Sequence, residues 1–198
     1  SFYLSKPERF SIKLLEFNEE INCATARNIG FQETTSKIVG FLDGDILVPE
    51  IFFEELKKYL DETEHNSKIA GLCPVFAAHR SSETKLQHYD NLEDIYSLNR
   101  YKEGNYIKLF QGFCIIIKAN VFLEAGMFDK YLIASEDRAL AIKVIRLGYK
   151  IRCMSDVEIL HSNPSTVKNI IRRKRWHAMG NAQLSLNNPA EYQRGIIE

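Results

Sequence analysis

An apolar run that ends in two carboxylates is the feature that most restricts how this chain can fold. Residues 38–45 read Ile-Val-Gly-Phe-Leu-Asp-Gly-Asp. Such a run is typical of a buried strand, and because side chains alternate along a strand, Asp43 and Asp45 point the same way and could share a divalent cation. Ligands of open α/β sheets bind beyond the carboxyl ends of the strands, and Gly44 would let a phosphate or ribose approach the backbone. The alternative is an ordinary surface Asp-Gly turn.

Strand and helix patterns alternate over the first 76 residues, which favours an α/β fold with a mostly parallel sheet. The elements expected there are strand 10–17, helix 21–36, strand 37–43, helix 49–64 and strand 68–76. Farther on, the pattern predicts strand 110–118, a short helix 119–125, an amphipathic helix 136–147, one or two strands in 149–160 and a basic helix 165–184. Residues 77–109 are polar and weakly periodic, so we interpret them as a long excursion with one short helix near 91–100.

Length and composition argue against several classes of protein. The 198 residues suit a single domain, and 26 Lys and Arg balance 26 Asp and Glu, so no overall attraction to nucleic acid or a membrane follows. No apolar run is long enough to span a bilayer. The cysteines form no Cys-x-x-Cys pair, which argues against a zinc site. We interpret all of them as reduced core residues, which fits a cytoplasmic protein: Cys23, Cys73, Cys114 and Cys153.

A second acidic site, Ser135-Glu136-Asp137, stands at the start of the predicted helix 136–147. Acidic residues in a first turn are favoured by the helix dipole, and Ser is a good N-cap, so a purely structural role would explain this triplet. A functional role is also open, because a carboxylate on a rigid helix terminus is well placed to take a proton from a sugar hydroxyl. Asp137 is therefore a candidate general base.

Two further features carry candidate ligand-binding groups. His161 follows the predicted strand in 149–160. A lone His there is more often a surface or hydrogen-bonded residue, yet an imidazole with two carboxylates is a suitable set for Mn²⁺. Residues 172–176, Arg-Arg-Lys-Arg-Trp, are most simply a solvated helix face. One or two of these arginines could clamp a diphosphate, whereas nucleic-acid binding would need a broader basic footprint.

Taken in chain order, these pieces resemble the family 2 glycosyltransferases of the GT-A fold, over about residues 21 to 180. A single D-x-D is weak evidence, but five landmarks in the right order and spacing are specific. They are Ala26-Arg27-Asn28-Ile29-Gly30, Phe41-Leu42-Asp43-Gly44-Asp45, Gly126-Met127-Phe128-Asp129 with Ser135-Glu136-Asp137, Leu147-Gly148-Tyr149-Lys150, and Ile159-Leu160-His161. The resemblance implies one GT-A-like catalytic domain over residues 1–198, a nucleotide-diphospho-sugar transferase-like α/β fold with a mostly parallel sheet flanked by helices.

The resemblance also implies a function: inverting, metal-dependent transfer of a sugar from a nucleotide-sugar donor to a carbohydrate or other hydroxyl acceptor. Mn²⁺ or Mg²⁺ would be held by Asp43, Asp45 and His161 and would stabilise the leaving diphosphate. Asp137 would be the catalytic base, and Glu136 would help to hold the acceptor. The implied donor-binding residues are Arg27, Asn28, Asp43, Gly44, Arg172 and Arg175, and the implied acceptor-binding residues are Gly112, Phe113, Glu136 and Trp176, with acceptor choice in 77–109.

Departures from the family pattern shape the remaining expectations. The family begins with a strand, a helix and a second strand that hold the nucleobase, and these are not evident here. We therefore expect a fragment, or nucleotide binding that is incomplete or supplied elsewhere, and a sheet edge or apolar surface left uncovered. Processive polysaccharide synthases carry Q-x-x-R-W, but Arg172 replaces the Gln, so we do not infer a processive enzyme.

Two other interpretations of the function remain. One is a nucleotidyltransferase of related fold, which would usually show a Gly-rich basic loop near its start, and none is visible here. The other is a catalytically degenerate module that only binds a sugar nucleotide. A role in polysaccharide biosynthesis, a homo-oligomer and a peripheral position at the inner face of a membrane are also compatible with the resemblance.

Overall fold

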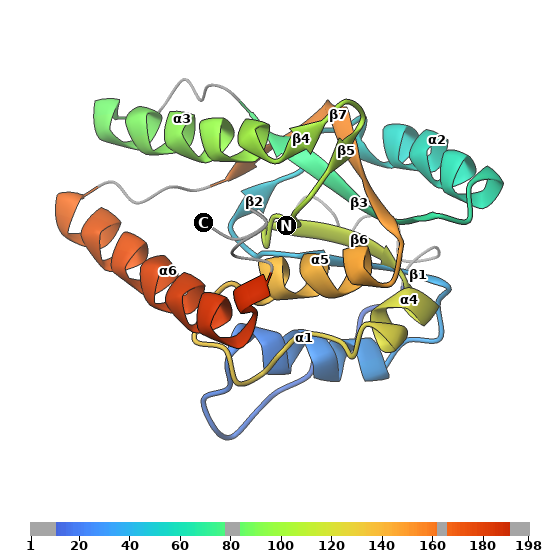
Figure 1. Ribbon diagram of the computed structural model, residues 1–198, viewed down its shortest axis with the longest axis horizontal. Coiled ribbons are helices and arrows are strands. Elements are labelled where there is room, and N and C mark those ends of the chain that lie inside the picture. Colours follow the sequence, from blue (N-terminus) through green and yellow to red (C-terminus); the bar gives the residue numbers. More distant parts are fainter. Residues whose placement is uncertain (1–10, 78–83, 162–165, 191–198) are drawn as a thin grey trace.

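A central sheet with helices on both of its faces makes up the computed structural model (Figure 1), which describes residues 11–77, 84–161 and 166–190. The helices are α1 (Cys23–Gln32), α2 (Phe52–His65), α3 (Lys85–Arg100), α4 (Ala119–Glu124), α5 (Glu136–Arg146) and α6 (Val167–Asn187). The strands are β1 (Ile38–Leu42), β2 (Ile46–Leu47), β3 (Ile69–Phe76), β4 (Lys102–Glu103), β5 (Tyr106–Ile107), β6 (Cys114–Lys118) and β7 (Lys150–His161). The predicted α/β class is confirmed.

The strand order is β1-β6-β3-β7-β5-β4, and β2 pairs with β7. The β3 and β7 strands are parallel neighbours, whereas β6 is antiparallel to both β1 and β3. Consequently β1, β3 and β7 run one way and β6 runs the other. The expected mostly parallel sheet is wrong for the described strands, in which only the β3–β7 ladder is parallel. The reason is where β6 begins: its first residue, Cys114, lies opposite Leu42 at the carboxyl end of β1, so β6 must run back across the sheet, antiparallel to β1 and β3.

Two local predictions differ from the structure. Residues 11–17 form no strand, and Ile12 and Leu14 are each 77% exposed, so their apolar alternation has no sheet to pack on; residue 10 lies outside the described residues. The helix expected near 91–100 is longer, because a capping box between Thr84 and Gln87 starts α3 at Lys85. The β4–β5 hairpin follows it within the excursion, whose residues 78–83 are also outside the description.

Separate clusters of apolar side chains hold helices against the two faces of the sheet. On the face covered by α1, α4 and α5, aromatic rings of Phe31, Phe41, Phe122 and Phe128 pack with centroids 4.9–5.1 Å apart. On the face covered by α2, Phe52 and Tyr59 belong to the second cluster. The aromatic cluster packs α1 against the face of the sheet that includes β1, and so places the polar side of α1 near the end of that strand.

The cysteines are only partly as predicted. Cys73, Cys114 and Cys153 are buried, but Cys23 is exposed. The core assignment of Cys23 is wrong because this residue opens α1, where the helix emerges toward solvent at the edge of the sheet. Within the described ranges, none of the helices has the length and apolarity needed to cross a bilayer.

Candidate active site

The carboxyl ends of β1, β3 and β7 lie at one edge of the sheet, where β6 begins. The β1–β6 pairing ends at Leu42 and Cys114 and continues in a bond from the Asp43 backbone N–H to the Phe113 carbonyl, 3.0 Å long. In the β2–β7 ladder Ile46 lies opposite His161, which brings Asp45 next to that imidazole. Strand register alone therefore gathers groups that are far apart in the sequence.

Asp43, Asp45 and His161 form a set that could hold a metal ion. Each offers one ligand atom, and these atoms all lie within 4.8 Å of one another. The Nε2 atom of His161 lies 3.6 Å from a carboxylate oxygen of Asp45, and the ring centroids of Phe76 and Phe113 lie 6.2 Å from that of His161. Two carboxylates and an imidazole are the donor set that Mn²⁺ accepts, so the residues present fit the implied cation.

Arg27 joins the strand-end carboxylates to the start of α5. Its guanidinium donates to Asp43 Oδ1 at 2.6 Å, to Glu136 Oε1 at 2.7 Å and to the Gly112 carbonyl at 3.0 Å. The Arg27 side chain is only 10% exposed. A planar fork of donors can hold two carboxylates at fixed positions in a way that a point charge cannot. Arg27 was predicted to bind the donor, and within the protein its guanidinium already forms hydrogen bonds to two carboxylates and one carbonyl.

Ser135 begins α5 in an unexpected way. It occupies the N-cap position with φ 68° and ψ 25°, and its side chain makes no capping hydrogen bond. Its hydroxyl instead donates to Asn181 Oδ1 of α6, 2.7 Å away. The expected side-chain cap is thus wrong, since the left-handed backbone of Ser135 accompanies a hydroxyl that bonds to a neighbouring helix.

The Asp137 carboxylate is held by two backbone amides. The Gly112 N–H donates to Oδ2 at 2.9 Å, and the Arg138 N–H donates to Oδ1 at 2.7 Å. Burial raises the pKa of Asp137, although the charges on Arg138 and Arg27 oppose the shift. Burial and the charge on Asp137 likewise raise the pKa of Glu136. A carboxylate with a raised pKa and a free lone pair is a better proton acceptor than an ordinary one.

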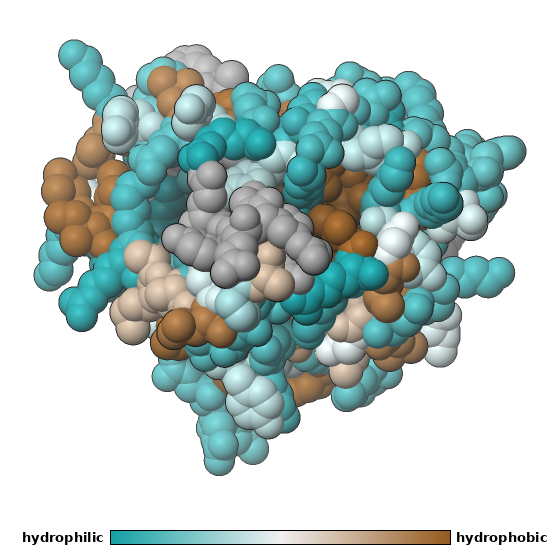
Figure 2. Space-filling view, viewed as in Figure 1, coloured by the Kyte–Doolittle hydropathy of each residue, from teal (hydrophilic) through white to brown (hydrophobic). Residues whose placement is uncertain are grey.

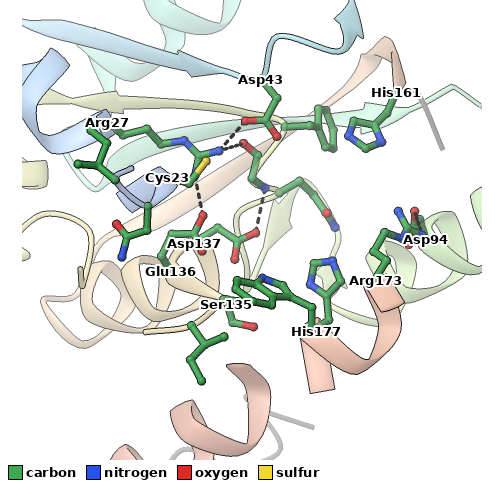
Figure 3. Close-up of a pocket in the computed structure, with 18 of the residues that line it drawn as sticks. Cys23, Arg27, Asp43, Asp94, Ser135, Glu136, Asp137, His161, Arg173 and His177 are labelled. Atoms are coloured by element: carbon green, nitrogen blue, oxygen red, sulfur yellow. Dashed lines mark hydrogen bonds and ion pairs between the residues drawn. The ribbon is translucent and has the colours of Figure 1, made fainter. Parts of the chain in front are cut away.

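Most of these groups line one pocket of about 630 Å³, but Asp45 is not among its lining residues. Figure 3 shows Asp43 and His161 on one side of it, Glu136 and Asp137 opposite, and Arg173 and His177 of α6 along the remaining side. The predicted site residues that line the pocket are Arg27, Asp43, Gly112, Phe113, Glu136, Asp137, His161 and Trp176.

Other predicted donor-binding residues lie elsewhere. The side-chain amide of Asn28 bonds to both the carbonyl and the N–H of Phe128, at 2.9 and 3.1 Å, so it ties α1 to the loop before α5. Gly44 is exposed beside the metal-ligand set. Arg172 and Arg175 are exposed on α6 and are not among the residues that line the pocket. The structure therefore brings the metal and base candidates together, but not the two arginines chosen from the basic run.

Arg173 is the arginine of that run that faces the pocket. Its guanidinium contacts Asp90 at 2.5 Å and Asp94 at 3.2 Å, and both carboxylates belong to α3. Burial lowers the pKa of His177, and the nearby charge of Arg173 lowers it further. The i, i+3, i+4 spacing of Arg173, Trp176 and His177 was the available signal, because such residues share one helix face. Sequence reasoning also missed Cys23, Asp94, Gln111 and Ser135 as pocket residues.

The mixed α/β architecture, a central sheet flanked by helices, is that of the GT-A fold. Two solved structures share this fold with the chain at low identity. The mannosyltransferase PcManGT from Pyrobaculum calidifontis, in complex with GDP-Man and Mn²⁺, aligns with a TM-score of 0.62 and 20% identity, covering 87% of this chain and 46% of its own. GalNAc-T7 with UDP, GalNAc and Mn²⁺ aligns with a TM-score of 0.52 and 15% identity, covering 79% and 35%. The predicted GT-A fold is confirmed.

A family model supplies the closer assignment. The model described as Glycosyl transferase family 2 matches residues 2–131, so the chain belongs to this family and the predicted resemblance is confirmed. A relative in Mycobacterium tuberculosis, named pre-mycofactocin glycosyltransferase, is 22% identical over 183 residues, which cover 90% of this chain. The match spans 38% of that relative's length.

Proposed function

We propose that this domain transfers a sugar from a nucleotide-sugar donor to a hydroxyl acceptor, with inversion and with a divalent cation. The observation that supports the proposal most is the opposition of two groups of side chains across one pocket. Of the metal-ligand candidates at the strand ends, Asp43 and His161 line the pocket, and the carboxylates of Glu136 and Asp137 lie opposite them. A pocket of about 630 Å³ is within the usual range for a small-molecule site.

The donor's diphosphate would lie on the strand-end side of the pocket. Asp43, Asp45 and His161 would hold Mn²⁺ or Mg²⁺ there, and Arg27 keeps the Asp43 carboxylate in place. When bound, the cation would offset the negative charge that develops on the leaving diphosphate. The cations in both structural neighbours are consistent with this assignment, because each was solved with Mn²⁺ and a nucleotide or nucleotide-sugar.

Asp137 would act as the general base. Its two backbone hydrogen bonds fix the carboxylate, so that a remaining lone pair can accept the acceptor's hydroxyl proton. The acceptor oxygen then forms a bond to the anomeric carbon while the bond from that carbon to the diphosphate breaks. Attack from the face opposite the leaving group inverts the anomeric centre, and one base suffices without a covalent intermediate. Glu136, held by Arg27, would orient the acceptor.

The acceptor would lie between α6 and the strand ends. Trp176 and Phe113 provide apolar surface there, and Arg173 and His177 provide polar groups. Asp94 of α3 places part of the 77–109 excursion at this side, which supports its proposed part in acceptor choice. We assign to Arg173, rather than Arg172 or Arg175, any contact that an arginine of this run makes with a ligand in the pocket.

The direct test is a panel of nucleotide-sugars with and without Mn²⁺. A donor that binds only the folded state raises the melting temperature, and transfer or hydrolysis releases a nucleoside diphosphate. Alkylation of Cys23 gives a second measure, because this thiol lines the pocket while the other three are buried. A productive donor should slow that alkylation. Metal-dependent binding without turnover would favour a binding-only module, and binding of nucleoside triphosphates alone would favour a nucleotidyltransferase.

A further inference from the structure

The side of α6 that faces away from the protein combines basic and apolar residues. Ile170, Gly180 and Leu184 are the buried residues of α6 and mark the side that packs on the domain. The opposite side carries what we call the outer face of α6. Its members lie along one side of the helix at spacings that combine steps of three and four residues, and they are Lys168, Ile171, Arg172, Arg175, Met179 and Leu186.

The basic residues of α6 divide into two groups. Arg173 and Lys174 form ion pairs with Asp90, Asp94 and Glu93 of α3, which neutralise them within the protein. Lys168, Arg172 and Arg175 form no ion pair with the described part of the chain. No residue of α6, all of which is described, is acidic. The outer face therefore presents a local positive charge on a chain whose formal net charge is zero.

The apolar residues of the outer face are open to solvent. Ile171 is 62% exposed, Met179 is 45% exposed and Leu186 is 82% exposed. Figure 2 shows hydrophobic side chains among hydrophilic ones at the left of the molecule, beside the N-terminal part of α6 in Figure 1. Leaving these side chains in water forgoes the favourable free energy of their burial.

We propose that the outer face of α6 binds the surface of an anionic lipid bilayer. Lys and Arg side chains can place their charges among headgroups while their alkyl stems lie along apolar surface, so basic and apolar residues can share one face. Lys is depleted at protein–protein interfaces whereas Arg and Met are enriched, so the choice of a bilayer rests on charge: the outer face carries three cations, and α6 has no acidic residue to offset them. The pocket would stay open, because Arg173 and His177 point into it from a different side of α6. This proposal does not depend on the proposed sugar transfer.

Flotation with lipid vesicles tests the proposal directly. The protein should bind vesicles of phosphatidylcholine mixed with phosphatidylglycerol, should bind phosphatidylcholine alone much less, and should dissociate at high salt. Lys168→Glu, Arg172→Glu and Arg175→Glu combined should weaken binding by at least about 10²-fold, since each basic residue near an anionic surface contributes about a fivefold factor. The matched control is Lys37→Glu, Lys57→Glu and Lys150→Glu, which reverses three exposed charges outside α6.

Apolar substitutions form the second arm. Ile171→Ser with Leu186→Ser should weaken binding by about tenfold or more, whereas Leu47→Ser with Leu123→Ser, exposed on other elements, should not. Equal loss in the control variants, or equal binding to neutral vesicles, would refute the proposal. So would a dimer in solution that the outer-face variants dissociate, because a second copy would then occupy this face.

Discussion

Gly180 of α6 packs against the backbone of Ala134 so closely that no side chain fits between them. A Cβ atom on Gly180 would lie 2.7 Å from the carbonyl carbon, the carbonyl oxygen and the Cβ of Ala134. The next residue, Ser135, donates its hydroxyl to Asn181 of the same helix. Because Glu136 and Asp137 follow immediately, the close packing of α6 against this segment fixes the positions of the proposed catalytic carboxylates.

Replacing Gly180 tests that relationship. Gly180→Ala should lower the free energy of unfolding by about 1–3 kcal/mol, the usual cost of overpacking a close contact, and should lower turnover because the Ser135 segment must shift. Gly30→Ala is the matched control: no atom lies within 4 Å of a Cβ built there, and an α-helical Gly→Ala change should raise stability by about 0.5–1 kcal/mol. Denaturant titration of both variants measures the difference. Equal stabilities would mean that α6 is not seated on Ala134.

Several parts of the site were predictable because they depend on local rules. Asp43 and Asp45 end an apolar strand, and strand ends are where α/β folds bind ligands. His161 could be placed with them only through the order of family landmarks, because the β2–β7 register that brings it to Asp45 joins residues distant in sequence. The base candidate Asp137 was predictable from its helix terminus, but its hydrogen bond from Gly112 was not.

The errors also have physical causes. A run of consecutive cations does not reveal which of them faces inward, because the helix phase is set by tertiary contacts such as those of Ile170, Gly180 and Leu184. The pocket-facing residue is therefore Arg173, not Arg172 or Arg175. The direction of β6 was missed for a similar reason. Strand–helix alternation predicts parallel neighbours, but a long excursion can bring the next strand in at either end of its neighbours, and so in either direction.

Arg27 should prove to be a positioning residue as much as a ligand. Arg27→Lys keeps the positive charge but cannot bridge Asp43 and Glu136 with a planar fork, so kcat should fall by more than KM rises. Loss of charge-assisted hydrogen bonds at a site that is 10% exposed should also lower stability by about 1–3 kcal/mol. Steady-state kinetics and thermal denaturation provide the two measurements. A large rise in KM with kcat unchanged would instead assign Arg27 to donor binding alone.

Asp45→Asn tests the proposed cation site. This carboxylate is exposed and lies beside His161, so its loss should leave the fold intact while abolishing Mn²⁺-dependent binding of a nucleoside diphosphate. Asp61→Asn, at an exposed position on α2, serves as the control for removal of one negative charge. Calorimetric titration of the diphosphate with and without Mn²⁺ decides the matter. Undiminished metal-dependent binding in the Asp45 variant would contradict the proposed ligand set.

Asp137→Asn tests the proposed base. The amide keeps the shape of the side chain but cannot accept the acceptor's proton, so turnover should fall by at least about 10²-fold. Donor affinity should change little, because the base lies across the pocket from the metal-ligand set. If turnover stays near that of the unmodified protein, Glu136 or a bound water is the base.

The pH dependence separates a catalytic Asp137 from a purely structural one. Because burial raises its pKa, the acidic limb of kcat should lie at higher pH than an ordinary aspartate would give, and activity should fall as the pH drops through that pKa. The same raised pKa has the opposite effect on stability: activity falls as the pH drops, but the free energy of unfolding contributed by this group rises. A carboxyl whose pKa is raised by folding binds protons more readily in the folded state, so its ionised form lowers stability above the folded pKa and protonation relieves that cost. Asp137→Asn should therefore lose the acidic limb of residual activity. Its single amide oxygen can accept from only one of the Gly112 and Arg138 N–H groups, so the free energy of unfolding should fall by about 1–3 kcal/mol. A collapse of stability in this variant would show that the aspartate mainly holds Gly112 and the start of α5 in place.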